Sequence, residues 1–128
     1  MKQVGRFLTE CDLMPMTDGE HWRLKARLVF HSEAILETIY VPTGFVTDLA
    51  SIPRLFWNIL PPFGRYTEAA IVHDWIYRNH TFSRMVCDVL FFEMMVALNT
   101  PTVTRWIIYL AVRCFGWSAW NNEKRRIL

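Results

Sequence analysis

Apolar side chains occupy every second position from Trp22 to Phe30, and arginine or lysine fills most of the positions between them. This period of two predicts a β-strand with one buried face and one basic, solvated face. We expect a turn over residues 31–33 and a second strand over 34–41. Shorter strands over 4–9 and 45–47 complete a small antiparallel sheet, so the first 48 residues are predicted to be mainly strands.

The pattern changes to helices in the second part of the chain. Ser51 followed closely by Pro53 predicts a helix start, because serine caps helices and proline fits the first turn. Longer helices are expected over 66–78, 83–98 and 103–120. Strands followed by helices predict an α+β fold, in which one domain spans residues 1–128. Its C-terminal part, residues 51–122, would form a bundle of three to four helices.

The composition supports one ordered domain and argues against a nucleic-acid polymer as its partner. The chain has 128 residues, of which 52% are hydrophobic and 15% aromatic, enough apolar mass for a real core. A net charge of +2 is too small to indicate a nucleic-acid polymer as partner. Three cysteines without a CxxC pair favour a reducing compartment over a disulfide framework.

No membrane-spanning or targeting segment is predicted. The longest apolar run toward the C-terminus covers 106–112, far below the roughly 20 residues that span a bilayer. The N-terminal residues Met1 to Arg6 lack the apolar stretch of a signal peptide. We therefore expect a soluble, intracellular protein.

The segment His73-Asp74-Trp75-Ile76-Tyr77 carries the densest group of residues with potential chemistry. With 3.6 residues per helical turn, His73 and Tyr77 lie on one face of the predicted helix. Asp74 lies about 100° round, on the flank of that face. The spacing therefore presents an imidazole and a phenol together, with a carboxylate beside them.

A short connection brings a second acidic residue toward this segment. Residues 79–82 leave room only for a tight turn, so the two helices that flank them become antiparallel neighbours. Folding the hairpin at its centre places His73 opposite Asp88, and Tyr77 opposite Arg84. The sequence thus predicts a histidine–aspartate pair across two helices, supported by a tyrosine.

Such a pair has a catalytic use and a structural one. A carboxylate that accepts a hydrogen bond from one ring nitrogen fixes the tautomer of His73 and raises its basicity. The other nitrogen then deprotonates a water molecule or binds a metal ion. Asp74 would hold a divalent cation, calcium or another, beside it. Alternatively, a buried His–Asp–Tyr network simply ties the two helices together.

Two further candidates lie between the predicted sheet and the helices, where functional residues often occur. Asp48 is a candidate ligand for a metal ion or a substrate, and Ser51 is a candidate substrate-binding residue. Each also has a plain structural explanation. Asp48 suits an Asx turn, in which its side chain bonds to nearby backbone N–H groups, and Ser51 suits a helix cap.

Arg113 interrupts a helix that is otherwise apolar and rich in tryptophan. A charge in that setting needs a partner, because burying it alone is very costly. The candidate partners are Asp74, Asp88 and Glu93. Alternatively, Arg113, together with Arg84, binds a substrate phosphate. We expect the tryptophan-rich face of this helix to pack in the core, with a membrane interface as the alternative.

Residues 41–54 read VPTGFVTDLASIPR, and several short blocks follow in order along the chain. Together they resemble a family known from phages and prophages, the domain of unknown function 1353, whose leading motif is similar to residues 41–54. The resemblance covers about residues 40–120. It implies a protein of the infected bacterial cytoplasm or of the virion, and it implies no established activity. The later blocks are Gly64-Arg65-Tyr66, Ala69-Ala70, His73 to Tyr77, Ser83-Arg84 with Asp88, and Ala111-Val112-Arg113 with Phe115-Gly116 and Trp120.

The His-Asp-x-x-Tyr segment with a later aspartate is also distantly similar to the phospholipase A2 active site. The resemblance implies that His73 activates water, that Asp74 binds calcium, and that Tyr77 and Asp88 support the histidine. This chain lacks the glycine-rich calcium loop and the cysteine pairs of the secreted enzymes. Asp48 would have to replace that loop as a cation ligand.

These observations leave three hypotheses for the function. The first is a small hydrolase that acts on an ester or a phosphodiester through His73 and Asp88, with or without a divalent cation. The second is a non-catalytic binder of a small anionic ligand, such as a host nucleotide signal. The third is a virion or tail-assembly component that associates with itself or with other virion proteins through apolar surfaces.

Overall fold

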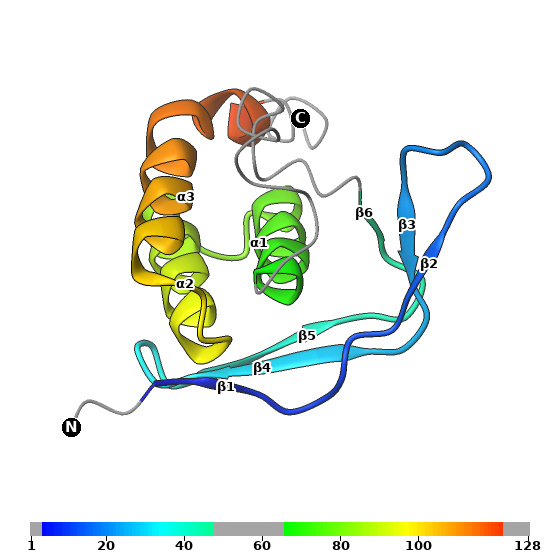
Figure 1. The fold of residues 1–128 in the computed structure, drawn as a ribbon, viewed down its shortest axis with the longest axis horizontal. Helices are drawn as coiled ribbons and strands as arrows, with labels where there is room; N and C mark the ends of the chain where they lie inside the picture. The colour runs from blue at the N-terminus through cyan, green and yellow to red at the C-terminus, as the bar shows by residue number, and fades with distance from the viewer. Residues whose placement is uncertain (1–3, 48–65, 122–128) are drawn as a thin grey trace.

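The computed structural model describes residues 4–47 and 66–121, and it has the predicted α+β architecture (Figure 1). Within these described residues, six strands form two antiparallel sheets of three strands each. The first sheet has the order β1-β4-β5, made of Arg6–Phe7, Leu28–Ser32 and Glu37–Val41. The second has the order β2-β3-β6, made of Leu13–Pro15, Trp22–Leu24 and Val46–Thr47.

The described part of the chain after residue 65 holds three helices, and two of them cover the first sheet. They are α1 (Thr67–Asn79), α2 (Arg84–Ala97) and α3 (Thr102–Phe115). Residues 117–121 form a further short helical stretch. Helices α1 and α2 pack on the β1-β4-β5 sheet, whereas α3 packs on α2. In the described part of the chain, no helix combines the length and the apolar character that crossing a membrane requires.

The predicted helices begin and end close to the observed residues. Ser83 caps α2, because its side chain accepts a hydrogen bond from the backbone N–H of Val86. The helix predicted over 103–120 is interrupted at Gly116, so its last turn is separate from α3. The short helix predicted from Ser51 lies outside the described residues.

The prediction of one continuous strand over 22–30 is wrong. The chain leaves the β2-β3-β6 sheet after Leu24 and enters the β1-β4-β5 sheet at Leu28. All three residues between them are exposed, so the alternation of buried and exposed positions stops there. The register shows the switch, because Leu24 pairs with Leu13 and Leu28 pairs with Val41.

Two further differences concern the strands. The turn predicted over 31–33 lies at 33–36, where Leu36 takes a positive φ of 54°, and β5 starts at Glu37. Strand β2 was not predicted at all. It contains Pro15, a residue that lacks a backbone donor and is therefore confined to edge positions.

The core lies between the first sheet and the helices. Strands contribute Phe30 and Val41, and the helices contribute larger numbers of aliphatic and methionine side chains. Helix α3 gives only Ile108, Ala111 and Val112 to the buried set. The fully buried helical side chains include Ile71, Ile76, Leu90, Phe91, Met94, Met95 and Ile108.

One carboxylate fixes α2 on the sheet. Glu93 accepts hydrogen bonds from the backbone N–H of Gly5 (3.0 Å), Glu33 (2.9 Å) and Ala34 (3.2 Å). It also accepts one from the hydroxyl of Ser32 at 2.6 Å. An added Cβ at Gly5 would clash with the carbonyl oxygen of His31, so glycine permits this close approach. Glu93 thus joins the middle of α2 to β1 and to the β4–β5 turn.

Candidate functional site

The α1–α2 hairpin brings His73 and Asp88 into direct contact, as the spacing predicted. Nε2 of His73 lies 2.8 Å from Oδ1 of Asp88. The hydroxyl of Tyr77, one turn along α1, donates to the same oxygen at 2.6 Å. Tyr77 therefore reaches Asp88 as well as Arg84, the residue that the hairpin geometry placed opposite it.

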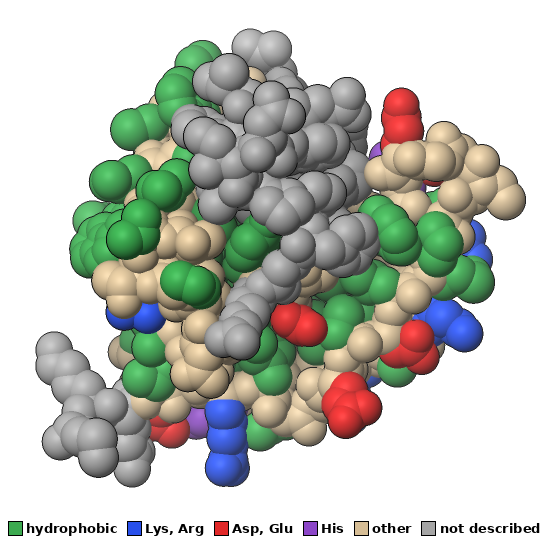
Figure 2. Space-filling view, viewed as in Figure 1, with side chains coloured by type: hydrophobic (Ala, Val, Ile, Leu, Met, Phe, Trp, Pro, Cys, Tyr) green, Lys and Arg blue, Asp and Glu red, His purple; other side chains and the backbone are tan. Residues whose placement is uncertain are grey.

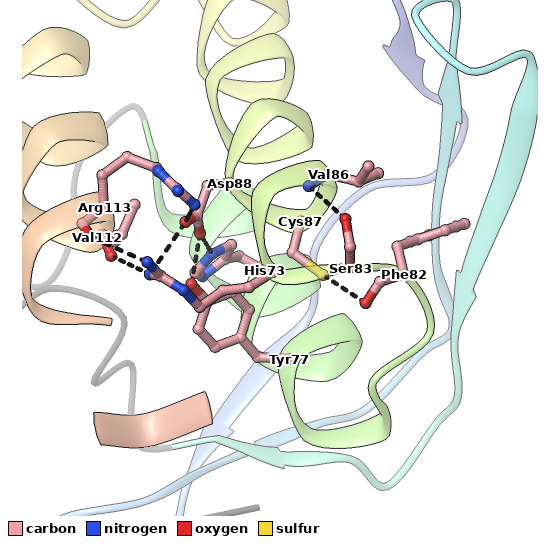
Figure 3. Close-up of polar contacts among 10 residues, drawn as sticks. His73, Tyr77, Phe82, Ser83, Val86, Cys87, Asp88, Val112 and Arg113 are labelled. Carbon is pink, nitrogen blue, oxygen red and sulfur yellow. Dashed lines mark hydrogen bonds and ion pairs between the residues drawn. The ribbon is translucent and has the colours of Figure 1, made fainter. Parts of the chain in front are cut away.

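Helix α3 supplies the rest of the site through Arg113. Its Nη1 donates to Oδ2 of Asp88 at 2.8 Å (Figure 3). Of the three acidic residues that the sequence offered as partners of Arg113, the structure thus selects Asp88. Nη1 of Arg84 lies 3.6 Å from the same oxygen. Arg84 also donates to the carbonyl oxygens of Val112 (3.1 Å) and Arg113 (3.2 Å), which binds the start of α2 to the end of α3. We call His73, Tyr77, Arg84, Asp88 and Arg113 the Asp88 cluster.

The centre of the Asp88 cluster is sealed and its rim is not. The side chains of His73 and Asp88 are 2% and 0% exposed. Those of Arg84 and Arg113 are 23% and 28% exposed. Phe91 stacks on the His73 ring at a centroid distance of 4.4 Å. Within the cluster, the two guanidinium groups are therefore more exposed than the His73–Asp88 pair.

Burial and hydrogen bonding set the charge of the central pair. Burial lowers the pKa of His73 below its ordinary 6.5, although the Asp88 carboxylate opposes this shift. Burial raises the pKa of Asp88, but hydrogen bonds from His73, Tyr77 and Arg113 outweigh it and bring the pKa below the ordinary 3.8. At neutral pH the pair is therefore a neutral imidazole and a carboxylate.

These charge states determine the histidine tautomer. A carboxylate only accepts hydrogen bonds, so the Nε2 that faces Asp88 must carry the proton. Nδ1 of His73 is then the nitrogen with the lone pair, and it has the electronic character of a base. Asp88 on α2 thus orients the ring of His73 on α1, as the spacing of the two residues predicted.

Asp74 occupies a different environment from His73. Its Oδ2 accepts a hydrogen bond from the Thr47 hydroxyl at 2.6 Å, and its Oδ1 pairs with Nε of Arg78 at 3.1 Å. Arg78 in turn donates to the carbonyl oxygen of Val46 at 2.9 Å. These contacts join α1 to β6, and a guanidinium beside the carboxylate fits a bound cation poorly.

The remaining candidates for metal and substrate binding are only partly placed. Asp48 and Ser51 lie outside the described residues. Across 4–47 and 66–121, no group of three or more histidine, cysteine, aspartate or glutamate side chains is arranged to hold a metal ion. Arg84 and Arg113, predicted to bind substrate, both lie at the rim of the Asp88 cluster.

Sequence analysis did not anticipate the aromatic contacts around Tyr77. The Trp120 ring makes an edge contact with Tyr77 at 5.3 Å and stacks on His80 at 3.6 Å. Nε2 of His80 also lies 3.1 Å from the Trp120 carbonyl oxygen. The residues of these pairs are about forty positions apart, and no spacing rule connects them. Their aromatic character was the only signal in the sequence.

Comparison with known proteins places the chain in a family. The uncharacterized protein y4jT of Sinorhizobium fredii is 40% identical to it over an alignment of 89 residues, and the match covers 66% of this chain and 26% of that relative. The chain thus matches about a quarter of the length of y4jT. No solved structure matches the chain. A family model described as "Protein of unknown function (DUF1353)" matches residues 22–112, and the chain belongs to this family.

Proposed function

We propose that this protein is a hydrolase in which His73 is the general base that activates a water molecule. The observation that carries the proposal is the 2.8 Å contact between Nε2 of His73 and Oδ1 of Asp88. This contact orients the imidazole and leaves Nδ1 as its basic nitrogen. Because His73 is almost sealed, the group that reaches it must be small, which suits water better than a bulky nucleophile.

The chemical step follows from these roles. A water oxygen attacks the phosphorus or carbonyl carbon of an ester while one of its protons passes to Nδ1 of His73. The resulting imidazolium is stabilised by the Asp88 carboxylate, which Tyr77 and Arg113 hold in place. The bond to the leaving oxygen then breaks, and the proton on His73 is relayed to that oxygen by a water molecule. One ester and one water give one acid and one alcohol.

The rim of the Asp88 cluster favours an anionic substrate. Arg84 and Arg113 surround a single carboxylate, so the local charge of these three groups is positive. Guanidinium groups bind phosphate oxygens well, and both are partly exposed. These features support a phosphodiester over a neutral ester. No step in this scheme passes through a metal ion.

The test is hydrolysis of bis(p-nitrophenyl) phosphate and p-nitrophenyl butyrate by the wild type and by His73→Gln. We expect kcat/KM for the phosphodiester to fall at least about 100-fold in His73→Gln. His21→Gln is the matched control, because His21 is a partly exposed histidine in the β2–β3 connection and its substitution should leave the rate unchanged. A wild type without activity on either substrate, or equal activity of both variants, contradicts the proposal.

A second candidate function is the binding of a small anion without turnover. It is favoured by the contrast between the sealed His73 and the partly exposed arginines of the rim. A panel of mono- and dinucleotides tests it by thermal shift. Ligand at 100 times its Kd adds about 2.7 kcal/mol to the free energy of unfolding. A shift that Arg113→Gln abolishes, without product formation, would select binding over hydrolysis.

A further inference from the structure

The outward faces of α2 and α3 are mostly apolar, with the Thr102 hydroxyl at the start of α3 as an exposed polar group. In α2 the outward positions follow the helical spacing of three and four residues, and in α3 they do the same. Leu110 in α3 is 55% exposed. A helix that is apolar on its solvent side as well as on its packed side normally has something covering it. The outward side chains are Met85, Val89, Phe92 and Val96 in α2, and Val103, Trp106, Leu110 and Cys114 in α3.

The two outward stripes form one surface, which we call the outer apolar face. Phe92 of α2 contacts Trp106 of α3 at a ring-centroid distance of 4.8 Å and Tyr109 at 5.5 Å. Trp106 and Tyr109 contact each other at 5.8 Å. Figure 2 shows hydrophobic side chains gathered on the side of the molecule where α3 lies. The face is therefore continuous across both helices.

The charged side chains that α2 and α3 offer toward solvent are arginines. The only acidic residues of α2 and α3 are Asp88 and Glu93. Asp88 is held inside its cluster, and Glu93 is bonded to the sheet and its turn. The basic residues of the two helices are Arg84, Arg105 and Arg113. Arg105 lies over the ring of Phe92 at 5.6 Å, next to the apolar side chains.

We propose that the outer apolar face binds the surface of an anionic lipid membrane. Tryptophan and tyrosine suit the boundary between acyl chains and headgroups, because each has an apolar ring and one polar group. Arginines beside an apolar helix face add attraction to anionic headgroups. Trp106, Leu110 and Phe92 would enter the outer acyl region, and Arg105 would contact phosphates.

The charge distribution favours lipid over a second copy of the chain. Two copies joined through this face would gather arginines from both, and α2 and α3 would supply no outward carboxylate to pair with them. An anionic bilayer supplies the missing negative charge. This inference does not rest on the proposed hydrolysis, and membrane binding and catalysis are measured separately.

A reporter on the face itself tests the proposal. Cys114 is an exposed thiol in the outward stripe, so an environment-sensitive fluorophore is attached there in a Cys11→Ser background. Vesicles of phosphatidylglycerol with phosphatidylcholine should shift its emission to the blue, and phosphatidylcholine alone should shift it much less. A fluorophore on Leu36→Cys, in a background with Cys11→Ser and Cys114→Ser, is the control and should stay unshifted.

Substitutions on the face give an independent measurement. Trp106→Ser combined with Leu110→Ser should weaken co-sedimentation with the anionic vesicles at least about tenfold. Leu36→Ser is the matched control, since Leu36 lies in the β4–β5 turn and is 74% exposed. Added salt should also weaken binding of the wild type. If the double variant fails to fold, the fluorophore on Cys114, which leaves the rest of the face unchanged, decides whether the face binds vesicles.

Three outcomes overturn the proposal. The first is an unshifted reporter with no co-sedimentation of the protein with vesicles. If the protein is also a monomer, the partner of the face would then be an acidic protein segment. The second is binding to vesicles that the double variant retains in full. The third is a stable dimer, seen by light scattering, that the double variant dissociates, because the face would then belong to a second copy.

Discussion

Oδ2 of Asp88 lies 2.8 Å from Nη1 of Arg113, and this contact joins the end of α3 to the middle of α2. Removing the carboxylate charge would leave that guanidinium and His73 without their buried partner. We expect Asp88→Asn to lower the free energy of unfolding by about 3 kcal/mol. Urea unfolding measures the change. Glu37→Gln, an exposed carboxylate at the start of β5, should change stability by less than about 0.5 kcal/mol.

Stability should fall as the pH drops below about 6.5. The pKa of His73 is lowered in the folded state, so below 6.5 the unfolded chain binds a proton that the folded chain excludes. Each pH unit in this window then costs up to about 1.4 kcal/mol. The lowered pKa of Asp88 adds stability above 3.8, which is lost as the pH falls through the folded-state pKa.

Unfolding curves measured between pH 4 and pH 8 check this linkage. His73→Gln should lose the slope just below pH 6.5, whatever its stability at neutral pH. His21→Gln should keep that slope. An unchanged slope in His73→Gln would show that other groups cause the acid sensitivity.

Gly116→Ala should destabilise the protein although alanine favours helices. Gly116 has an ordinary helical φ of −70°, so propensity alone would predict a gain of about 1 kcal/mol. The added Cβ would clash with the Val112 carbonyl oxygen and lie 2.9 Å from the Tyr77 hydroxyl. We expect a net loss of about 1–3 kcal/mol in thermal or urea unfolding. Ser118→Ala, an exposed change two residues later, should be nearly neutral.

Glu93→Gln should release α2 from the sheet edge. Each hydrogen bond to a charged group typically contributes about 1.5–3 kcal/mol to the free energy of unfolding. The Glu93 carboxylate accepts four such bonds, and the neutral amide of glutamine would replace them only in part. Hydrogen exchange should accelerate at the amides of Gly5, Glu33 and Ala34, which donate to Glu93. Amides in the middle of α1 serve as the internal reference. Unchanged exchange at the three amides would refute the anchoring role.

Asp74→Asn separates the anchoring role of Asp74 from a metal-binding role. Losing its contacts with Thr47 and Arg78 should cost about 1 kcal/mol. We expect millimolar calcium to leave the melting temperature of the wild type unchanged, because a cation at Asp74 would have to displace Arg78. A calcium-dependent rise that is absent in Asp74→Asn would instead establish the cation site that the motif predicted.

The α1–α2 part of the site was predictable because it depends on local geometry. The short connection and the helical period together place His73 opposite Asp88, and Ser83 marks where α2 begins. The partner of Arg113 was not predictable in the same way. Three acids were compatible with the sequence, and the choice of Asp88 depends on how α3 crosses α2, which no local pattern encodes.

The strands were harder to predict for a related reason. Alternation continues from Trp22 to Phe30 in the sequence, yet the chain changes sheets within it. The pairing of Leu24 with Leu13 competes with the pairing of Leu28 with Val41, and both are long-range interactions. The Glu93 anchor has the same origin, since its donors lie about sixty and ninety residues away.

The position of Asp88 has a consequence for how the protein opens. The Asp88 carboxylate accepts hydrogen bonds from α1 and from α3. If either helix detached, the buried charge would lose part of its hydrogen bonding, which is costly. Partial opening of either helix should therefore be rare, and the three helices should exchange their slowest amide hydrogens with a common free energy. The Asp88 cluster makes the helical half one cooperative unit.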